Sequence, residues 1–345
     1  MIVISDYPEE VGGHKFIDIL ATLPGPYSKH PDFTAYYTQQ KARLGGKVEP
    51  SRDAWKLDRF KFLPMVNAAY EMRPNASWYV FLEADVYIFW DNLFRLLDQF
   101  NPQEMHYLGS AVPGSKGRWF AYGGAGIVIS HALMQSLVGD GTILSERYQK
   151  MALNDCCGDA VLAYVILAKT GIKLKDLHPM FSGDYLPDLG IDEQRWCTPL
   201  ISLHRMSIDS LRSLWRWERT RRASQKPLVF SDMLSYRQPL LQNTSVHDFW
   251  DNLSADILPN DDGAIHSSLT CAEACERNAT CLQYSYTRNE CRLWPYILHG
   301  HEVKEKDVEI VSGWDRQKMR DLGLDFADFG GSTCETGRWT DPILH

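Results

Sequence analysis

The residues Trp78-Tyr79-Val80-Phe81-Leu82-Glu83-Ala84-Asp85 are the most informative stretch of this sequence. Its first five residues form a continuous apolar run of strand length, which is typical of a central strand covered on both faces of a sheet. Two acids follow, with one residue between them. Because side chains alternate along an extended chain, Glu83 and Asp85 can reach the same side and hold a divalent cation. Taken alone, the triplet fits a solvated loop equally well.

Strands alternate with helices on both sides of this stretch. Strands are expected at 2–5, 78–82, 127–129 and 200–203, and helices at 55–72, starting or bending near Pro64, and at 160–168. This alternation over residues 1–220 predicts an α/β layer structure with a mainly parallel sheet. In such sheets, ligands gather beyond the carboxyl ends of the strands, where Glu83, Asp85 and His204 are expected.

Three further features could take part in the same chemistry. The small residues Gly123-Gly124-Ala125-Gly126 let the backbone pass close to a ligand, or form a tight turn before a strand. Asp159 opens the apolar helix and could accept a proton as a general base, or simply cap the helix. His204 could bind a metal ion as a neutral imidazole, although a single histidine is more often structural.

The bulk composition excludes some classes of function. The chain has 345 residues and a net charge of −8, which argues against nucleic acid as a partner. Its basic cluster, from Arg205 to Arg222, is predicted to be a solvated helix face, with a donor-phosphate site as the alternative. No run of about 18 apolar residues predicts a membrane span, and no signal peptide is recognised. If the protein is luminal, we expect its targeting segment and membrane anchor to lie outside this chain.

Cysteine positions and glycosylation sequons point to an oxidising compartment. Four of the eight cysteines fall within residues 271–291, with no histidine pair that would complete a zinc pattern. N-x-Ser/Thr sequons occur at Asn75, Asn243, Asn252 and Asn278. We therefore expect a protein of the secretory pathway.

The order of these motifs is more specific than any one of them. A strand with acid-x-Asp is followed by Phe-x-Tyr-Gly-Gly-Ala-Gly, by Cys-Cys-Gly-Asp opening a helix, and by a strand with a histidine. This order resembles the Fringe and core 1 β1,3-galactosyltransferase group, glycosyltransferase family 31, most closely its fungal branch. The resemblance covers residues 1–220. It implies a GT-A fold and an inverting transfer of sugar from a UDP-sugar to a glycan hydroxyl on a glycoprotein or glycolipid. The linkage that the resemblance implies is β1,3.

The resemblance also implies roles for individual residues. Asp85 and His204 would bind Mn²⁺ or Mg²⁺, and Asp159 would be the catalytic base. Glu83 and the loop residues Gly123, Gly124, Ala125 and Gly126 would contact the UDP-sugar, whose sugar would be of the galactose or N-acetylglucosamine type. Glu83 departs from the family, which has Asp at that position. The family fold also begins with a strand and helix ahead of a segment like residues 2–6, so the first strand is expected to be missing.

The C-terminal cysteines resemble those of a PAN/apple module. The expected domains are a GT-A domain at 1–225, a linker at 226–262, the module at 263–318 and a tail at 319–345. Spacing alone allows three pairings of the four clustered cysteines. The resemblance implies Cys271–Cys291 and Cys275–Cys281, and we expect Cys197 to pair with Cys156 or Cys157. The module could contact proteins or glycans, or be purely structural.

Two other functions remain open. The chain could be a non-catalytic glycan- or protein-binding protein on a transferase scaffold. A secreted glycosidase would use two carboxylates across a cleft, which the motif order does not favour. As a transferase, the protein is expected in the Golgi lumen, as a type II membrane protein when full length.

Overall fold

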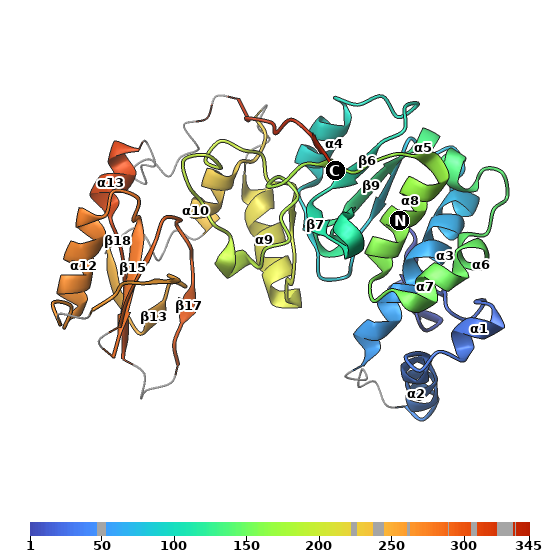
Figure 1. Ribbon diagram of the computed structural model, residues 1–345, viewed down its shortest axis with the longest axis horizontal. Coiled ribbons are helices and arrows are strands. Elements are labelled where there is room, and N and C mark those ends of the chain that lie inside the picture. Colours follow the sequence, from blue (N-terminus) through green and yellow to red (C-terminus); the bar gives the residue numbers. More distant parts are fainter. Residues whose placement is uncertain are drawn as a thin grey trace. The chain divides into compact units, whose positions relative to one another are not determined.

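The computed structural model describes residues 1–46, 53–221, 226–236, 245–260, 263–288, 290–304, 309–322, 334 and 336–345. The chain forms two compact units (Figure 1). Unit 1 comprises residues 1–83, 99–178 and 341–345, and unit 2 comprises residues 84–98 and 179–340. The division passes through the acidic triplet rather than near residue 225, so the expected domain boundaries differ from those of the structure. Both units mix helices with strands, as the α/β prediction requires.

Unit 1 is built on a five-stranded sheet in the order β19-β10-β6-β9-β4. Its strands are Ile343–Leu344, Lys175–Asp176, Tyr107–Gly109, Ile127–Ser130 and Trp78–Phe81, in that order. Only β10 and β6 run parallel, and the other three pairings are antiparallel. The predicted mainly parallel sheet is therefore wrong. The β7–β8 hairpin (Ala111–Pro113 and Trp119–Ala121) joins β6 to β9, whereas a parallel pair would need a longer crossover.

The apolar run that opens the acidic triplet lies at one end of this sheet. Strand β4 pairs with β9 and is the last in the strand order of the described residues. Of its four residues only Tyr79 is buried, and Leu82 just beyond it is 38% exposed. The expectation of a central strand covered on both faces is therefore wrong, because an end strand meets fewer neighbours on either face.

The described part of unit 1 also contains helices, and the two longest were expected from the sequence. Helix α3 (Asp58–Met72) follows the short turn Ala54–Leu57 and contains Pro64 in its interior, so the helix predicted at 55–72 is confirmed. Helix α8 (Gly158–Thr170) ends at Gly171, whose φ of +71° suits glycine. The remaining helices are α1 (Gly25–Ser28), α2 (Phe33–Leu44), α5 (His131–Val138), α6 (Leu144–Arg147) and α7 (Gln149–Asn154).

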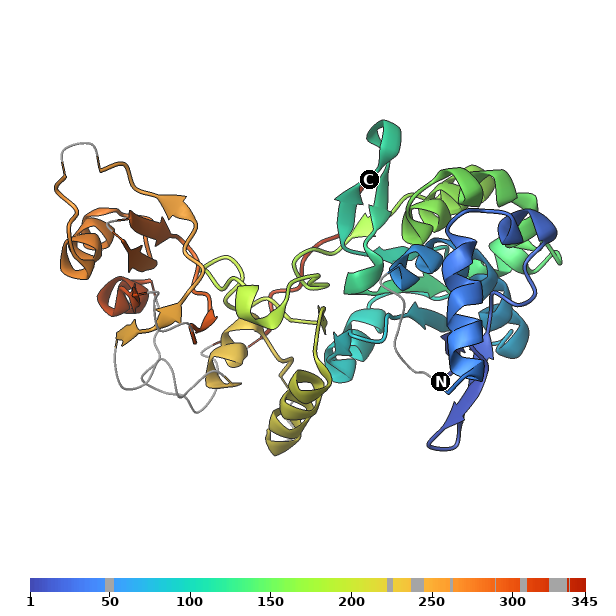
Figure 2. The ribbon, with the colours of Figure 1, turned by 90° about the horizontal axis from the view of Figure 1, so that it is seen from below.

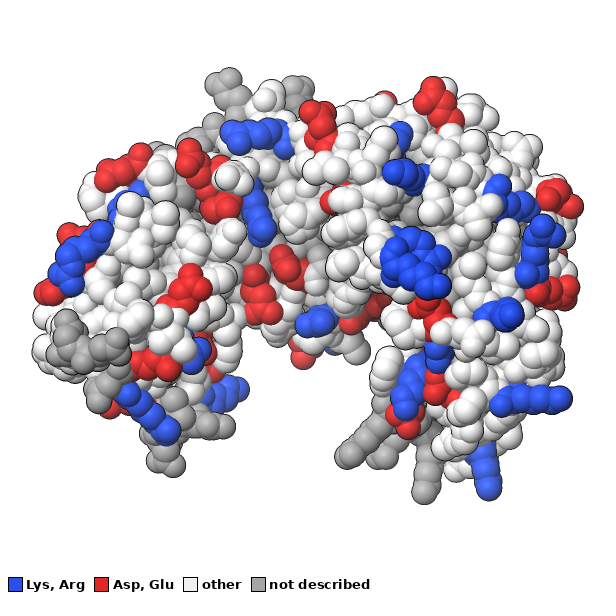
Figure 3. All heavy atoms as spheres, viewed as in Figure 1, with Lys and Arg blue, Asp and Glu red and all other residues white. Residues whose placement is uncertain are grey.

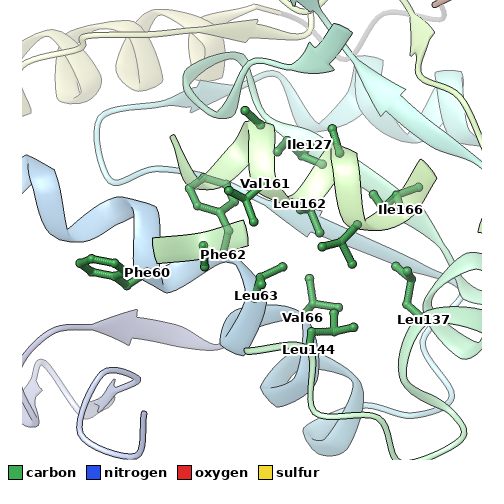
Figure 4. Packing of buried hydrophobic residues seen from close by; sticks show 14 of the residues in the cluster. Phe60, Phe62, Leu63, Val66, Ile127, Leu137, Leu144, Val161, Leu162 and Ile166 are labelled. Carbon is green, nitrogen blue, oxygen red and sulfur yellow. The ribbon is translucent and has the colours of Figure 1, made fainter. Parts of the chain in front are cut away.

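The core of unit 1 lies between α3 and α8. Figure 4 shows Leu63 and Val66 of α3 facing Val161 and Leu162 of α8, and all four side chains are almost completely buried. Burying one such side chain contributes about 1.5–3 kcal/mol. This packing holds the first turn of α8, which carries Asp159, at a fixed place in unit 1.

A small second sheet, β1-β3-β2, contains the N-terminal strand. Its strands are Val3–Ser5, His14–Asp18 and Glu9–Val11. Figure 2 shows the β2–β3 hairpin beside α2, where Arg43 pairs with Glu9 at 3.1 Å. The strand predicted at 2–5 is present, but it is half-buried rather than buried because it belongs to this small sheet.

Unit 2 has a first part formed by residues 84–98 and 179–236. Strands β5 (Tyr87–Ile88) and β11 (Ser202–Leu203) pair antiparallel within it. Helices α4 (Trp90–Leu97), α9 (Ile208–Thr220) and α10 (Met233–Tyr236) accompany them. Short turns lie at Leu186–Asp188 and Phe230–Asp232. Phe89, Leu200 and Phe230 are buried in the core of this part.

The second part of unit 2, the cysteine-rich module, comprises the described residues within 245–322. An antiparallel sheet in the order β12-β18-β15-β16-β14 packs against helix α12 (Ser268–Arg277). Those strands are Val246–Asp248, Ile310–Trp314, Gln283–Thr287, Glu290–Trp294 and Asp256–Ile257. A separate pair joins β13 (Trp250–Asp251) to β17 (His301–Glu302), and α13 (Arg316–Asp321) follows β18.

The described part of the predicted linker 226–262 is therefore structured. Strand β12 pairs with β18 and β14 pairs with β16, so both belong to the module's own sheet. The predicted tail likewise contains the end of α13 and the strand β19 of unit 1. Polar composition and prolines misled the prediction, because short strands at the edge of a small sheet need few apolar residues.

The disulfides divide into those close in sequence and those set by packing. Cys271–Cys291 and Cys275–Cys281 are present, and this confirms the pairing that the resemblance implied. The pairing expected for Cys197 is wrong. Cys197 bonds to Cys334 in the core of unit 2, whereas Cys156 and its neighbour Cys157 bond to each other in unit 1.

The sequons also differ in environment. Asn75 and Asn278 are exposed, but Asn252 is completely buried and its side-chain amide donates to the Tyr284 carbonyl at 3.0 Å. Asn252 is therefore inaccessible to glycosylation in the folded chain. Asn243 lies outside the described residues.

The surface carries charged side chains of both signs. Figure 3 shows basic and acidic side chains interspersed over one face. In the basic cluster, Trp215 of α9 is 51% exposed and the Arg219 guanidinium lies 4.7 Å from its ring centroid, in agreement with a solvated helix face. Arg222 lies outside the described residues. Among the described helices, none is both long and apolar enough to cross a membrane.

Candidate functional site

The carboxylate of Glu83 lies beside the glycine loop because of strand register. Strands β4 and β9 are antiparallel, and Phe81 at the end of β4 pairs with Ile127 at the start of β9. Residues just after β4 and just before β9 must therefore be neighbours. The loop before β9 is a single 3-10 turn, Gly123–Ala125, and this turn faces Glu83.

Asp159 approaches the same turn from the N-terminus of α8. Its Oδ2 accepts a hydrogen bond from the backbone N–H of Gly123 at 2.9 Å, and its Oδ1 accepts one from Ala160 at 2.9 Å. The N-cap of α8 is Cys157, so Asp159 lies inside the first turn. Simple capping therefore does not describe Asp159, which joins the helix N-terminus to the glycine turn.

The pKa of Asp159 is raised above the ordinary value for aspartate. Burial is the main cause, because it disfavours the charged carboxylate, and the nearby carboxylate of Glu83 raises the pKa further. The hydrogen bonds from Gly123 and Ala160 oppose this shift without cancelling it. A carboxyl group with a raised pKa holds a proton more tightly, which is what a general base requires.

Two glycines permit this arrangement. A Cβ on Gly123 would lie 2.9 Å from Glu83 Oε1 and 3.4 Å from Asp159 Oδ2, so only glycine leaves room for both carboxylates. A Cβ on Gly158 would lie 2.7 Å from the backbone oxygen of Asp58 and 2.5 Å from the Phe62 ring. Gly158 thus lets α8 begin directly against α3. Sequence reasoning missed its role, although it stands within the Cys-Cys-Gly-Asp motif.

Lys61 of α3 is a second functional candidate that sequence reasoning missed. Its ammonium group pairs with Asp58 at 2.9 Å and with Asp6 at 3.2 Å. Burial lowers the pKa of Lys61, but the two carboxylates outweigh this effect and the net pKa is raised. Lys61 therefore stays charged beside the acidic residues of unit 1. The i, i+3 spacing of Asp58 and Lys61 was the available signal.

Asp85 and His204 meet in unit 2 through a different piece of backbone. The antiparallel pairing of Leu203 with Tyr87 brings the residues that flank the two strands together. His204 Nε2 lies 3.5 Å from Asp85 Oδ1. The backbone carbonyl of Asp85 accepts from Met206 N–H at 3.0 Å, and that of Asp184 accepts from His204 N–H at 3.1 Å. The imidazole is buried, whereas 46% of the Asp85 side chain is exposed.

The donor chemistry of this pair suits a divalent cation. A carboxylate oxygen and an imidazole nitrogen are ligands that Mn²⁺ accepts, and carboxylates also suit Mg²⁺. Such ions commonly use one or two protein ligands and complete their shell with water and substrate phosphates. The partly exposed Asp85 leaves space for such ligands, so the residues present fit the expected group.

The comparison with known families covers this acidic region. Residues 43–184 match the family model described as Fringe-like. This segment is therefore similar to the Fringe-like family. Its members are glycosyltransferases of the secretory pathway, with a GT-A-like α/β architecture. No curated protein matches the chain.

The Fringe-like segment contains Glu83, Asp85, the glycine turn and Asp159, and it ends before His204. Unit 1 brings Glu83, Gly123 and Asp159 together, and unit 2 brings Asp85 and His204 together. The other expected loop residues, Gly124, Ala125 and Gly126, are buried, and Gly126 has a φ of +91° at the start of β9. These three residues form or directly follow the turn, and all of them lie within the Fringe-like segment.

Proposed function

We propose that this chain is an inverting UDP-sugar glycosyltransferase. It would transfer a galactose or N-acetylglucosamine type of sugar to a hydroxyl of a glycoprotein or glycolipid glycan, in β1,3 linkage. The observation that carries the proposal is the half-buried Asp159 carboxylate held by the Gly123 backbone within a Fringe-like segment. The metal, donor and linkage rest on the motif resemblance and on the donor chemistry of Asp85 and His204.

Asp159 would act as the base. Inversion requires the acceptor oxygen to attack the anomeric carbon as its proton leaves. The proton would pass to an Asp159 carboxylate oxygen while the new carbon–oxygen bond forms. The bond from the anomeric carbon to the donor phosphate would break, and its electron pair would leave with UDP. The raised pKa of Asp159 favours this proton transfer.

Asp85 and His204 would hold Mn²⁺ or Mg²⁺, which supplies positive charge to the diphosphate. Only Ala84 separates Asp85 from Glu83, so covalent geometry keeps their Cα atoms within about 7 Å of each other. Glu83 would then contact the donor or a metal-bound water, in a place where the resembling family has a shorter aspartate. These assignments imply work in the Golgi lumen, where glycan acceptors are available.

The deciding experiment measures UDP release from a panel of UDP-sugars with Mn²⁺ and neutral glycan acceptors. We expect acceptor-dependent release from UDP-galactose or UDP-N-acetylglucosamine, and loss of turnover in Asp159→Asn with retained fold. The matched control is Asp209→Asn on α9, where the side chain is 95% exposed and turnover should not change. Turnover retained in Asp159→Asn would remove this residue as the base. A chain that binds no UDP-sugar with metal would instead be a non-catalytic binder.

A further inference from the structure

A cavity of about 630 Å³ lies inside unit 2, between the cysteine-rich module and the helices α9 and α10. This volume is within the range of roughly 300–1,000 Å³ that is usual for small-ligand sites. Aromatic rings, hydroxyls and imidazoles dominate its lining. The residues that carry the argument are Tyr185, Ser213, Tyr236, His247, Trp250 and Glu302.

One wall belongs to the module and is held rigidly. The Trp250 indole N–H donates to the backbone carbonyl of His299 at 2.8 Å, and the two rings meet edge to face at 5.5 Å. The β13–β17 pairing sets Trp250 opposite Glu302. A large aromatic surface and a carboxylate are therefore presented together without a need for reorganisation on binding.

The opposite wall comes from the first part of unit 2. The Tyr236 hydroxyl donates to Ser213 Oγ at 3.0 Å, and its ring packs against Trp217 at 5.4 Å. Tyr185 is 39% exposed, so a ligand can reach its ring. Tyr185 directly follows Asp184, whose carbonyl accepts the backbone N–H of His204. The cavity thus begins one residue from the backbone that positions the proposed metal ligand.

The charge of the lining selects the class of ligand. Glu302 is the sole acid among the described lining residues, and neither Lys nor Arg occurs among them. Phosphate, sulfate and sialic acid would therefore meet no lysine or arginine side chain in this lining. A neutral pyranose has an apolar C–H face that packs on aromatic rings and hydroxyls that hydrogen-bond to serine, imidazole and carboxylate groups.

We propose that this cavity binds a neutral carbohydrate. Its use as a subsite for the acceptor glycan rests on the proposed transferase function, whereas the binding itself does not. The cavity would hold a sugar remote from the reacting hydroxyl, so that the module contributes to the choice of acceptor.

The test is titration of the whole chain, without UDP or metal, with lactose, N-acetyllactosamine and mannobiose, each followed by calorimetry. Sialyllactose is the anionic comparison. We expect at least one neutral glycan to bind, and Tyr185→Ala to raise its Kd about tenfold or more. The matched control is Tyr37→Ala in unit 1, whose side chain is 50% exposed and which should leave the Kd unchanged. Circular dichroism and thermal unfolding verify that both variants fold.

Absence of binding by all three neutral glycans would overturn the proposal. An unchanged Kd in Tyr185→Ala, or tighter binding of sialyllactose than of lactose, would do the same. The outcome is separable from that of the UDP-release experiment. Tyr185-dependent sugar binding in a chain without turnover would sustain the cavity and reject the transferase. Turnover without Tyr185-dependent sugar binding would sustain the transferase and reject the proposal for the cavity.

Discussion

The surroundings of Asp159 in unit 1 and the Asp85–His204 pair in unit 2 are built in different ways. In unit 1 the Asp159 carboxylate is half-buried, two backbone N–H groups hold it, and Gly123 leaves part of the space that it occupies. In unit 2 the imidazole is buried but the carboxylate is half-exposed, and a two-residue strand pairing brings them together. The first arrangement raises the pKa of the proposed base, whereas the second leaves space for further ligands on the proposed cation.

This contrast separates two kinds of failure. A substitution at Asp159 or in its surroundings should slow the chemical step, because the proposed base must be both positioned and desolvated. Damage to the open pair should weaken metal affinity, because the exposed side is completed by water and substrate. The following predictions test that separation.

The largest effect is expected from Asp159→Asn. An amide cannot accept the acceptor's proton, so kcat should fall by about 10²- to 10⁴-fold. The apparent Mn²⁺ affinity should stay unchanged, because Asp85 and His204 are untouched. Steady-state kinetics over a Mn²⁺ series measures both quantities. A variant that loses metal affinity instead of turnover would show that the two regions do not divide the work as described.

Asp85→Asn and His204→Ala should have the complementary effect. Each removes one ligand of the proposed cation site, so the Mn²⁺ concentration for half-maximal activity should rise about tenfold or more. Excess Mn²⁺ should restore part of the rate, which it cannot do for Asp159→Asn. Calorimetric titration of Mn²⁺ in the presence of UDP provides a direct measurement. Wild-type metal affinity in both variants would place the cation elsewhere.

Gly158→Ala tests the packing of α8 against α3, which holds Asp159 in place. The new methyl would press on the backbone of α3 at Asp58, so the free energy of unfolding should fall by about 1–3 kcal/mol. Gly25→Ala is the control, since its Cβ would meet nothing within 4 Å, and it should change stability by less than about 0.5 kcal/mol. Urea unfolding of both variants gives the comparison. Equal stabilities would mean that the helices adjust freely at this contact.

The smallest effect concerns pH. Because the folded pKa of Asp159 is raised above 3.8, its contribution to stability is present below that value and is lost as the pH rises through the folded pKa. The rate should fall on the acid side at a pH above 3.8, as the base becomes protonated. Unfolding free energies at pH 4 and pH 7 should differ less in Asp159→Asn than in the wild type. An identical pH dependence in the two proteins would argue against the raised pKa.

Some features were predictable because they depend on residues close in sequence. The apolar spacing along 55–72 and 160–168 predicted α3 and α8. The small module's disulfides pair cysteines only 20 and 6 residues apart, and the pairing implied by resemblance is present. Strand directions were not predictable, because an apolar run carries no information about its partner.

The sequence by itself determined which chemical groups are available and in which order: two acids after a strand, a glycine loop, an acid at a helix start and a histidine after a strand. Tertiary structure decided which of them meet. The Cys197–Cys334 bridge spans 137 residues, and the contacts of Lys61 with Asp6 and of Gly158 with α3 join segments that are remote in sequence. Local secondary structure follows from backbone geometry, but contacts between remote segments depend on which buried surfaces fit together. Only the folded chain can therefore give Asp159 a raised pKa and place Asp85 beside His204.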